Sequence, residues 1–514
     1  MRRLRFSVRL ASLTVTAVYS KISKDPIQFT KQVLERLRQS GLPVSRLFPR
    51  VLDKVGQNGP TEFNELVVRG EYSQAVAELS DGRRIPFYLR GKVADLKQVV
   101  QRLKREPLKA QFISLGDNTE PRVLHVLTNS LPYTNSGYTV RSHNVLLSQL
   151  KAGIDARALT RPGYPVVVGR VPQSSEQLID GIRYLRALPW VYEPTVGRRD
   201  AKFVKVIVEE AKNLGATVLH TTTDFSNALV VSEAADRLGI PWVYEVRGEL
   251  ENTWLSKLPM GLQREASESE FYIAARRAEE KSMNASAAVV VLSEVSKQSL
   301  VERGIPAEKI FVVPNGIDED YLTLTYDKNK IKRELGLDVD SKYVGTVSAI
   351  VGYEGLDVLI DAVQYLPSEW KVLIVGEGTE LPNLRRKVKE AALEDHVSLV
   401  GRKAPENIWK WYAALDVFAL PRVDMNVTRT VTPIKPVMAL ALGIPVVASD
   451  LPAIREVTGG YADYVTRSPK AIANAVVNAK VDRSEVGQWL KQRTWGENGK
   501  KYKHIYQKLL STKE

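Results

Sequence analysis

The residues with the clearest chemistry lie in a loop and helix near position 430. Two short apolar segments, VFAL (417–420) and IPVVAS (444–449), flank the stretch that contains PIKPVMALAL. This pattern predicts a helix over 433–442 that is closed by Gly443, with Thr432 able to cap its start and Pro433 or Pro436 in its first turn. Free N–H groups at such a helix start, together with Lys435, suit a phosphate group. The alternative is an ordinary strand–helix–strand unit that binds no ligand.

Two regions of the chain have the periodicity needed to position such a helix. Short apolar segments alternate with helical patterns over residues 120–320 and again over 325–485. This alternation predicts an α/β protein with two doubly wound domains, whose ligands bind at the carboxyl ends of parallel strands. Residues 486–514 contain an amphipathic helix near 495–510, and we expect that helix to pack back on the first of the two domains.

Residues 1–110 differ from the rest of the chain in their charge. They hold 22 lysines and arginines against 10 acidic residues, so they carry a net charge of +12 out of the +14 of the whole chain. The patterns at 26–41, 63–82 and 93–107 predict a mainly helical extension, in which 63–82 forms two short helices or one that is interrupted at Gly70. Its positive charge favours peripheral contact with an anionic membrane surface. Basic residues interleaved with aromatic ones are missing, which argues against nucleic acid as a partner.

The first twenty residues combine a basic start with a short apolar run. The run LASLTVTAVY (10–19) is too short to cross a bilayer and contains Ser12, Thr14 and Thr16. We expect a strand or an amphipathic surface segment there.

Composition excludes several kinds of chemistry. The chain has no cysteine, so disulfides, thiolate metal sites and cysteine nucleophiles are excluded. Its five histidines are scattered without the spacing of metal ligands. We therefore expect neither a metal nor a cofactor.

Seven segments of the chain together resemble a known family. In chain order they are HVLTNSLPYTNSGYTVRSHNVL (125–146), IPWVYEVRGELENTW (240–254), VVPNGID (312–318), GYEGLDVLIDAV (352–363), LIVGEGTEL (373–381), WYAALDVFALP (411–421) and TPIKPVMALALGIPVVASD (432–450). Their order resembles that of family-4 retaining glycosyltransferases, and the first two segments resemble a bacterial exopolysaccharide-type branch. The resemblance covers about residues 120–510 and leaves residues 1–110 unexplained.

The resemblance implies a GT-B fold, in which two Rossmann-like domains face a cleft. The second domain would bind a nucleotide-diphosphate sugar, and the first would bind a glycan, lipid-linked or protein acceptor. The sugar would be transferred with retention of configuration and without a metal, in the cytoplasm or peripherally at the inner face of the membrane. The residues implied on the catalytic side are His220, Arg247 and Glu251, with a satisfied strand-end histidine as the alternative for His220. The residues implied at the donor are Gly137, Arg402, Arg429, Thr432, Pro433, Lys435 and Met438.

Several positions depart from the family pattern. Ala349 and Glu354 stand where members often carry Arg and Lys, and Met438 stands where a Glu normally binds the ribose hydroxyls. Thr222 replaces the second histidine of a His-x-His pattern, and Arg429 replaces an acidic residue. A thioether is a poor hydrogen-bond acceptor, so these changes predict weakened donor binding. The alternative function is a catalytically degenerate member that binds a glycan or a partner enzyme as a scaffold.

Overall fold

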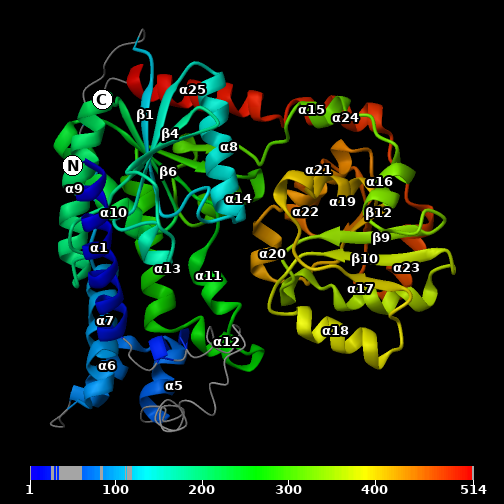
Figure 1. The fold of residues 1–514 in the computed structure, drawn as a ribbon, viewed down its shortest axis with the longest axis horizontal. Coiled ribbons are helices and arrows are strands. Elements are labelled where there is room, and N and C mark those ends of the chain that lie inside the picture. The colour runs from blue at the N-terminus through cyan, green and yellow to red at the C-terminus, as the bar shows by residue number, and fades with distance from the viewer. Residues whose placement is uncertain are drawn as a thin grey trace. The chain divides into compact units, whose positions relative to one another are not determined.

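The computed structural model describes residues 2–24, 28–30, 32–33, 61–80, 85–109, 112 and 119–511. The chain forms two compact units (Figure 1). The first unit comprises Met1–Val290 and Lys503–Glu514, and the second comprises Val291–Tyr502.

The first sheet has the strand order β3-β4-β2-β1-β5-β6-β7-β8. Its strands are β1 (Arg122–Leu127), β2 (Asp155–Thr160), β3 (Glu176–Ile179), β4 (Ile182–Arg186), β5 (Val218–Thr222), β6 (Trp242–Glu245), β7 (Ala288–Val291) and β8 (Ile310–Val312). β3 pairs with β4 in antiparallel fashion, whereas β4, β2, β1, β5, β6 and β7 pair in parallel. The chain moves outward from β1 to β2 and then returns to β5 on the other side of β1. The switch point at which an open α/β sheet binds ligands therefore lies between β1 and β5.

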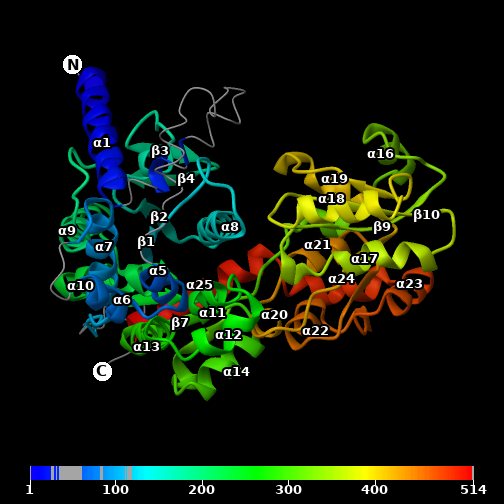
Figure 2. The ribbon, with the colours of Figure 1, turned by 90° about the horizontal axis from the view of Figure 1, so that it is seen from below.

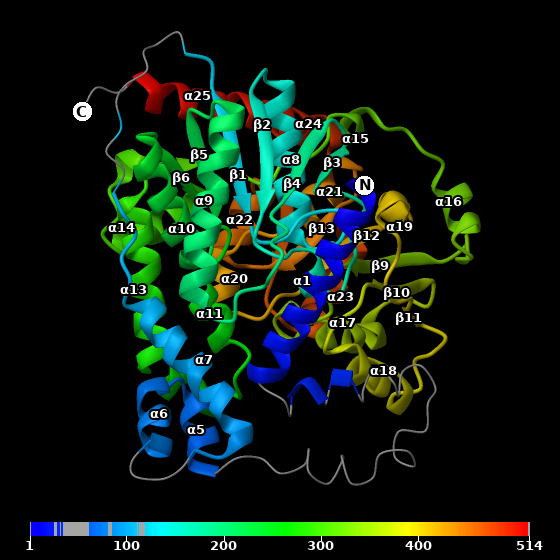
Figure 3. The same cartoon turned by 60° about the vertical axis from the view of Figure 1, so that its left-hand side comes forward.

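The helices of the first unit cover both faces of this sheet (Figure 3). They are α8 (Gly137–Lys151), η1 (Val166–Val168), α9 (Val196–Leu214), α10 (Phe225–Leu238), α11 (Leu250–Leu255), α12 (Met260–Ala266) and α13 (Glu270–Ala285). α8 begins at a capping box in which Ser136 and Thr139 bond each other's backbone N–H groups. α10 begins at Asp224, whose carboxylate accepts the N–H of Ser226.

The N-terminal region contributes further helices to the first unit. They are α1 (Arg2–Lys24), α5 (Thr61–Arg69), α6 (Tyr72–Ser80) and α7 (Phe87–Leu103). Phe63, Ala75, Leu89 and Val93 form a small core among α5, α6 and α7. Leu13 of α1 packs with Val166 and Leu188 of the sheet-bearing part. None of the described helices is both long enough and apolar enough to cross a membrane.

The second unit has its own parallel sheet, with the strand order β11-β10-β9-β12-β13-β14. Its strands are β9 (Lys342–Val347), β10 (Trp370–Val375), β11 (Val397–Leu399), β12 (Val417–Leu420), β13 (Val446–Ser449) and β14 (Ala462–Val465). The chain moves outward from β9 in one direction and from β12 in the other. The switch point of this sheet therefore lies between β9 and β12.

Helices pack on both faces of the second sheet, over two cores of aliphatic and aromatic side chains. The helical elements of this part of the chain are α14 (Glu294–Glu302), η2 (Ala307–Lys309), α15 (Asp320–Thr323), α16 (Lys328–Glu334), η3 (Gly352–Glu354), α17 (Asp357–Asp361), η4 (Ala362–Tyr365), α18 (Leu381–Glu390), η5 (Pro405–Asn407), α19 (Ile408–Ala413), α20 (Asn426–Thr430), α21 (Lys435–Ala441), α22 (Pro452–Thr458), α23 (Pro469–Asn478), α24 (Arg483–Lys491) and α25 (Trp495–Ser511). The last residues of α25 belong to the first unit.

The predicted fold class is confirmed, because two doubly wound units with parallel sheets follow a helical N-terminal region. The interruption that Gly70 predicts within 63–82 separates α5 from α6. The strand alternative for the first residues is wrong, since α1 is a helix. Most of the helix predicted over 26–41 lies outside the described residues.

Candidate functional site

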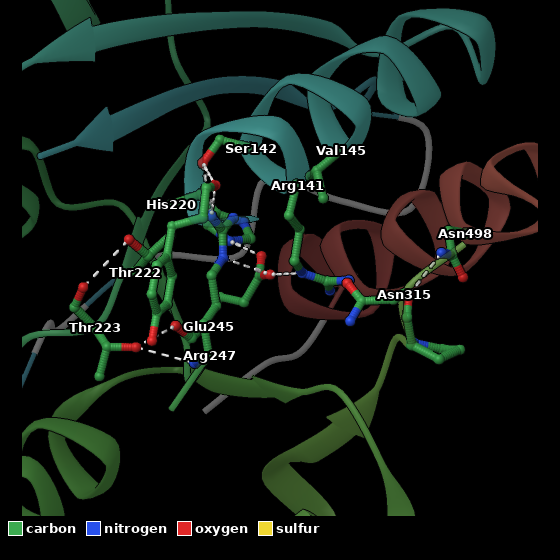
Figure 4. Close-up of polar contacts among 12 residues, drawn as sticks. Arg141, Ser142, Val145, His220, Thr222, Thr223, Glu245, Arg247, Asn315 and Asn498 are labelled. Carbon is green, nitrogen blue, oxygen red and sulfur yellow. Dashed lines mark hydrogen bonds and ion pairs between the residues drawn. The ribbon is translucent and has the colours of Figure 1, made fainter. Parts of the chain in front are cut away.

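A buried ionic cluster lies at the carboxyl ends of β5 and β6 in the first unit (Figure 4). Glu245, the last residue of β6, accepts hydrogen bonds from Arg141 Nε at 2.7 Å, Arg247 Nε at 2.9 Å and His220 Nε2 at 3.1 Å. We call Glu245, Arg141, Arg247 and His220 the Glu245 cluster. Each of the four side chains is at most a few per cent exposed, so the charges interact in a medium of low polarity.

A chain of neutral hydrogen bonds fixes the orientation of His220. Its Nδ1 lies 2.7 Å from the hydroxyl of Tyr506, which accepts a bond from Gln149 Nε2 at 2.8 Å. Gln149 Oε1 lies 2.8 Å from Nε2 of His125, whose ring stacks on that of His220. Every donor meets an acceptor if the proton of His220 is on Nε2, which donates to Glu245, and if Tyr506 donates to Nδ1. Both ring nitrogens of His220 are thus occupied inside the unit.

The protonation states follow from this arrangement. Burial lowers the pKa of His220, although the bond to Glu245 works in the opposite direction. Burial would raise the pKa of Glu245, but Arg247, Arg141 and His220 hold it well below its usual range. At neutral pH the cluster therefore contains an ionised carboxylate, two guanidinium ions and a neutral imidazole.

Arg247 also reaches the start of α8. Its Nη1 donates to the carbonyl oxygen of Tyr138 at 2.9 Å and to Ser142 Oγ at 2.6 Å, while its buried Nη2 has no hydrogen-bond partner in the described residues. Gly137 is the first residue of this helix, and a Cβ placed there would meet nothing within 4 Å. The backbone of α8 can therefore be approached closely at Gly137.

The three residues predicted on the catalytic side come from neighbouring segments. His220 is in the middle of β5 rather than at its end, and it is completely buried with both ring nitrogens bonded, as the alternative of a satisfied histidine requires. Arg247 belongs to the loop after β6, as the pattern indicated, and Glu251 is a buried residue of the short helix α11.

A second ionic cluster lies at the switch point of the second sheet. Glu354 is the last residue of η3, which follows β9, and Arg422 comes two residues after β12. Glu354 Oε1 accepts from Arg422 Nη2 at 2.9 Å and from Lys435 Nζ at 2.6 Å. We call Glu354, Arg422 and Lys435 the Glu354 triad. With side-chain exposures of 2%, 7% and 17%, it is a mostly buried group with one positive charge in excess.

Burial dominates the protonation of this triad. It lowers the pKa of Lys435 to about 8, even though Glu354 favours the charged amine. Burial would raise the pKa of Glu354, but Lys435 and Arg422 lower it overall. Burial therefore destabilises the charged form of Lys435, and a bound anion would stabilise that form.

The helix start beside the triad differs from the prediction. α21 spans Lys435–Ala441 rather than 433–442, and Ile434 is at its N-cap position without a side-chain cap, so Thr432 does not cap it. Pro433 and Pro436 carry no N–H, while the N–H groups of Val437 and Met438 bond to the carbonyl oxygen of Ile434. Few N–H groups remain for a ligand, so the cations of the triad are the stronger anion-binding feature.

The other predicted donor residues are spread around the second unit. Arg402 is an exposed residue in the loop after β11. Arg429 is bound at both guanidinium ends by Asp424, at 2.5 and 2.6 Å, on an exposed surface. Thr432 and Pro433 are buried, and Met438 packs against the core of the unit. Among these residues, only Lys435 belongs to the Glu354 triad.

Sequence reasoning missed three residues of the two clusters and Tyr506, the partner of His220. Glu245 lies in YEVR (244–247) and Arg141 in SGYTVR (136–141), and the signal available in the sequence was a charged residue near an apolar segment. Arg422 directly follows the segment VFALP. Tyr506 gave no signal, because its partner His220 is 286 positions away.

Two models of glycosyltransferase families each match a part of the chain. Residues 327–502 match the family model Glycosyl transferases group 1, and residues 136–316 match the Glycosyl transferase 4-like domain. The lipopolysaccharide core biosynthesis mannosyltransferase LpsB of Rhizobium meliloti is 34% identical over 158 residues, which are 29% of this chain and 43% of that protein. The amylovoran biosynthesis glycosyltransferase AmsK of Erwinia amylovora is 29% identical over 169 residues, which are 32% of this chain and 40% of that protein. These alignments thus span less than half the length of either relative.

Solved structures share the fold. The structure of HepE from Anabaena in complex with UDP-glucose superimposes with a TM-score of 0.56 at 18% identity, covering 76% of this chain and all of that one. The glycosyltransferase of Rickettsia africae gives the same TM-score at 16% identity, covering 77% of this chain and all of that one. The chain therefore has the GT-B fold, as predicted.

Proposed function

We propose that this chain is a glycosyltransferase that moves a sugar from a nucleotide-diphosphate donor to a glycan, lipid-linked or protein acceptor. The observation that carries the proposal is the Glu354 triad, which places two cations at the switch point of the sheet in the segment that matches Glycosyl transferases group 1. Cations held at this edge of an α/β sheet suit a diphosphate. A solved relative of the same fold was crystallised with UDP-glucose, which is the kind of donor proposed.

The chemistry proposed for the second unit is stabilisation of the leaving group. As the bond between the sugar and the diphosphate breaks, negative charge develops on the phosphate oxygens. Arg422 and Lys435 would neutralise that charge without a metal, and a bound diphosphate would compete with Glu354 for them. We further propose that the sugar is transferred with retention of its configuration.

The first unit would supply the acceptor side. The Glu245 cluster locks Arg247 against the start of α8, where Gly137 leaves room for a ligand. In this proposal Arg247 is the group that contacts substrate, and Glu245 and His220 are positioning residues that hold it. Glu251 is proposed on the same side from its place in the helix that follows the loop of Arg247.

A binding titration of the purified full chain with UDP, GDP and ADP tests this function. We expect one of the three to bind saturably, with an affinity that EDTA does not change. The matching nucleotide sugar should then be hydrolysed slowly in the absence of acceptor, and NMR of the first-formed sugar should show the donor's anomeric configuration. If none of the three nucleotides binds, the proposed enzymatic function is wrong. The alternative of a scaffold that binds a glycan or a partner enzyme is then favoured.

We further propose that α1 makes peripheral contact with an anionic membrane. Val8, Val15, Val18, Tyr19 and Ile22 recur at helical spacing and are 39–69% exposed. They form what we call the α1 stripe. The opposite side of the same helix holds the buried residues Leu13 and Ala17. Figure 2 shows α1 along one edge of the first unit, with its N-terminal end projecting.

The charge of α1 favours acidic lipid in particular. The helix sequence contains six lysines and arginines and no acidic residue. An apolar stripe flanked by basic residues is typical of helices that lie in the plane of a membrane surface, with about 1 kcal/mol contributed per basic residue that reaches it.

Vesicle sedimentation tests the α1 stripe. We expect the chain to bind vesicles that contain 30% phosphatidylglycerol and to bind purely zwitterionic vesicles at least tenfold more weakly, because the electrostatic term is then lost. The double variant Val15→Asp/Tyr19→Asp should bind the acidic vesicles at least tenfold more weakly. Val68→Asp, at an exposed apolar position of α5, is the matched control and should bind like the parent. Equal binding to both kinds of vesicle, or to neither, would contradict the proposal.

A further inference from the structure

A polar cavity in the first unit is separate from both ionic clusters. Its volume is about 210 Å³, and its walls include Thr128 after β1, Arg161 after β2, and Asp224 and Asn227 at the start of α10. Asn227 Nδ2 donates to Thr128 Oγ1 at 2.9 Å and so joins the segments that follow β1 and β5. The cavity therefore lies at the switch point of the first sheet, where open α/β sheets bind ligands.

Arg161 is a cation of this cavity that makes no ion pair with the described residues. Its backbone N–H is fixed by the carbonyl oxygen of Leu127 at 2.9 Å, so the residue is held at the strand end. Its Nε is fully buried, and within the described part of the chain it has no hydrogen-bond partner. Arg161 as a whole is partly exposed and lines the cavity, so its guanidinium is open to a ligand with acceptor oxygens.

The remaining charges leave the cavity positive. Arg102 and Arg199 also line it, against the two carboxylates of Asp200 and Asp224. Asp200 is already bound by Arg102 at 2.8 Å and by Arg105 at 2.7 Å. Asp224 accepts the N–H of Ser226, as the cap of α10, at 2.9 Å. Neither carboxylate forms an ion pair with Arg161, whose charge stays available to an anion.

Two long helices begin at the cavity and add to its positive potential. α9 has 19 residues and α10 has 14, and the first residues of both line the walls. Their N-terminal dipole ends favour negative charge near them. The dipoles act together with the charge of Arg161, which lines the same walls.

We propose that this cavity binds an anionic group, a phosphate or a carboxylate, on the acceptor. This inference rests on the proposed glycosyl transfer and names the class of acceptor. A volume of about 210 Å³ is below the 300–1,000 Å³ of sites for whole drug-sized ligands, so the cavity takes the charged end of an acceptor rather than all of it.

The inference also gives a role to the N-terminal extension. Arg102 belongs to α7, outside the two segments that match family models. Arg102 contacts Asp200 of α9. Gln98, which also belongs to α7, accepts the N–H of Val196 at the start of α9. Figures 1 and 3 show α7 beside the helices of the first unit. The extension therefore completes one wall of the cavity and adapts a common fold to a particular acceptor.

The test is a titration of the full chain with inorganic phosphate and with glucuronate at constant ionic strength, followed by NMR. We expect saturable binding of at least one of them, weakened at least tenfold in Arg161→Gln. Arg237→Gln is the matched control, because Arg237 lies on α10 but is 44% exposed and paired with Glu233. The control should bind like the parent. Equal affinity in Arg161→Gln and the parent, or no saturable binding of either anion, would overturn the inference.

Two further arms identify the source of the anion and separate this inference from the proposed function. Glucose 6-phosphate and dihexanoyl phosphatidic acid below its micellar concentration present the same phosphate on a sugar and on a lipid. If the sugar phosphate or the lipid phosphate binds more tightly than inorganic phosphate, and Arg161→Gln abolishes this difference in affinity, the site is supported. The ligand that binds more tightly then identifies the type of acceptor. Nucleotide binding should be the same in Arg161→Gln and the parent, so a failure here leaves the donor site untouched. Unfolding curves of the variant and parent should coincide, since the Arg161 side chain makes no hydrogen bond or ion pair with the described part of the chain.

Discussion

Glu245→Gln is expected to lower the free energy of unfolding of the first unit by about 3–5 kcal/mol, because it removes the charge from a buried ion cluster. The substitution keeps the size of the side chain but leaves Arg141 and Arg247 without the carboxylate that they share at 2.7 and 2.9 Å. Both guanidinium groups are at most 5% exposed, so water cannot replace the lost charge. Native-state hydrogen exchange of peptides from β5 and β6 measures the effect within this unit alone.

The matched control is Glu280→Gln. Glu280 pairs with Arg276 one turn away on α13, on a side of the helix where both residues are partly exposed. Such a pair contributes little, so the control should change the unfolding free energy by less than about 0.5 kcal/mol. A loss below 1 kcal/mol in Glu245→Gln would show that the cluster does not depend on its carboxylate.

The unfolding free energy of Glu245→Gln can also be compared with that of the parent as the pH is lowered. The arginines hold the folded-state pKa of Glu245 well below 4.5, so its contribution is present above the unfolded-state pKa and is lost as pH falls through the folded one. The difference in unfolding free energy between the parent and Glu245→Gln should therefore be constant from about pH 8 to about pH 5 and shrink at lower pH. A difference that grows on acidification would contradict the assigned charge states.

Local patterns were sufficient to predict the fold. Alternating apolar segments and helical patterns indicated two doubly wound units, because each strand and helix is specified by residues next to one another in the chain. The same was true of the interruption at Gly70 and of the helix end at Gly443, whose φ of 73° suits glycine. Boundaries were less accurate, as at α21, where two prolines and the carbonyl of Ile434 decide which residue begins the helix.

The sites were harder to predict, because they depend on contacts between distant residues. Lys435 was correctly singled out as a cation beside a helix start, but its pairing with Glu354, 81 positions earlier, is visible only in three dimensions. The cavity around Arg161 gave no sequence signal at all, since its walls come from five separate segments. His220 was predicted to face the substrate, but its side chain is bonded to Tyr506. Sequence patterns do not reveal a contact between residues 286 positions apart.

Lys435→Ala is expected to weaken nucleotide binding roughly tenfold to a hundredfold, which is the loss of one charge-assisted hydrogen bond. Lys435 Nζ lies 2.6 Å from Glu354, and burial lowers the pKa of this amine to about 8. A diphosphate that binds beside the triad would favour the charged amine and take it from Glu354. A titration of the parent and the variant with the nucleotide that the parent binds measures the loss. Lys410→Ala is the control, because Lys410 pairs with Glu334 elsewhere in the same unit and should not affect binding.

The opposed substitution is Met438→Glu, which should tighten nucleotide binding by about tenfold. It supplies a carboxylate one turn after Lys435, where a thioether now packs against the core and offers only a weak acceptor to a ribose. Met438→Leu keeps the apolar packing without adding an acceptor, so its affinity should equal that of the parent. The two expected changes have opposite signs and share one assay, so a general loss of folding cannot produce both. If Lys435→Ala binds like the parent, the triad is not the diphosphate site; if Met438→Glu shows no gain, the ribose is not held at this helix.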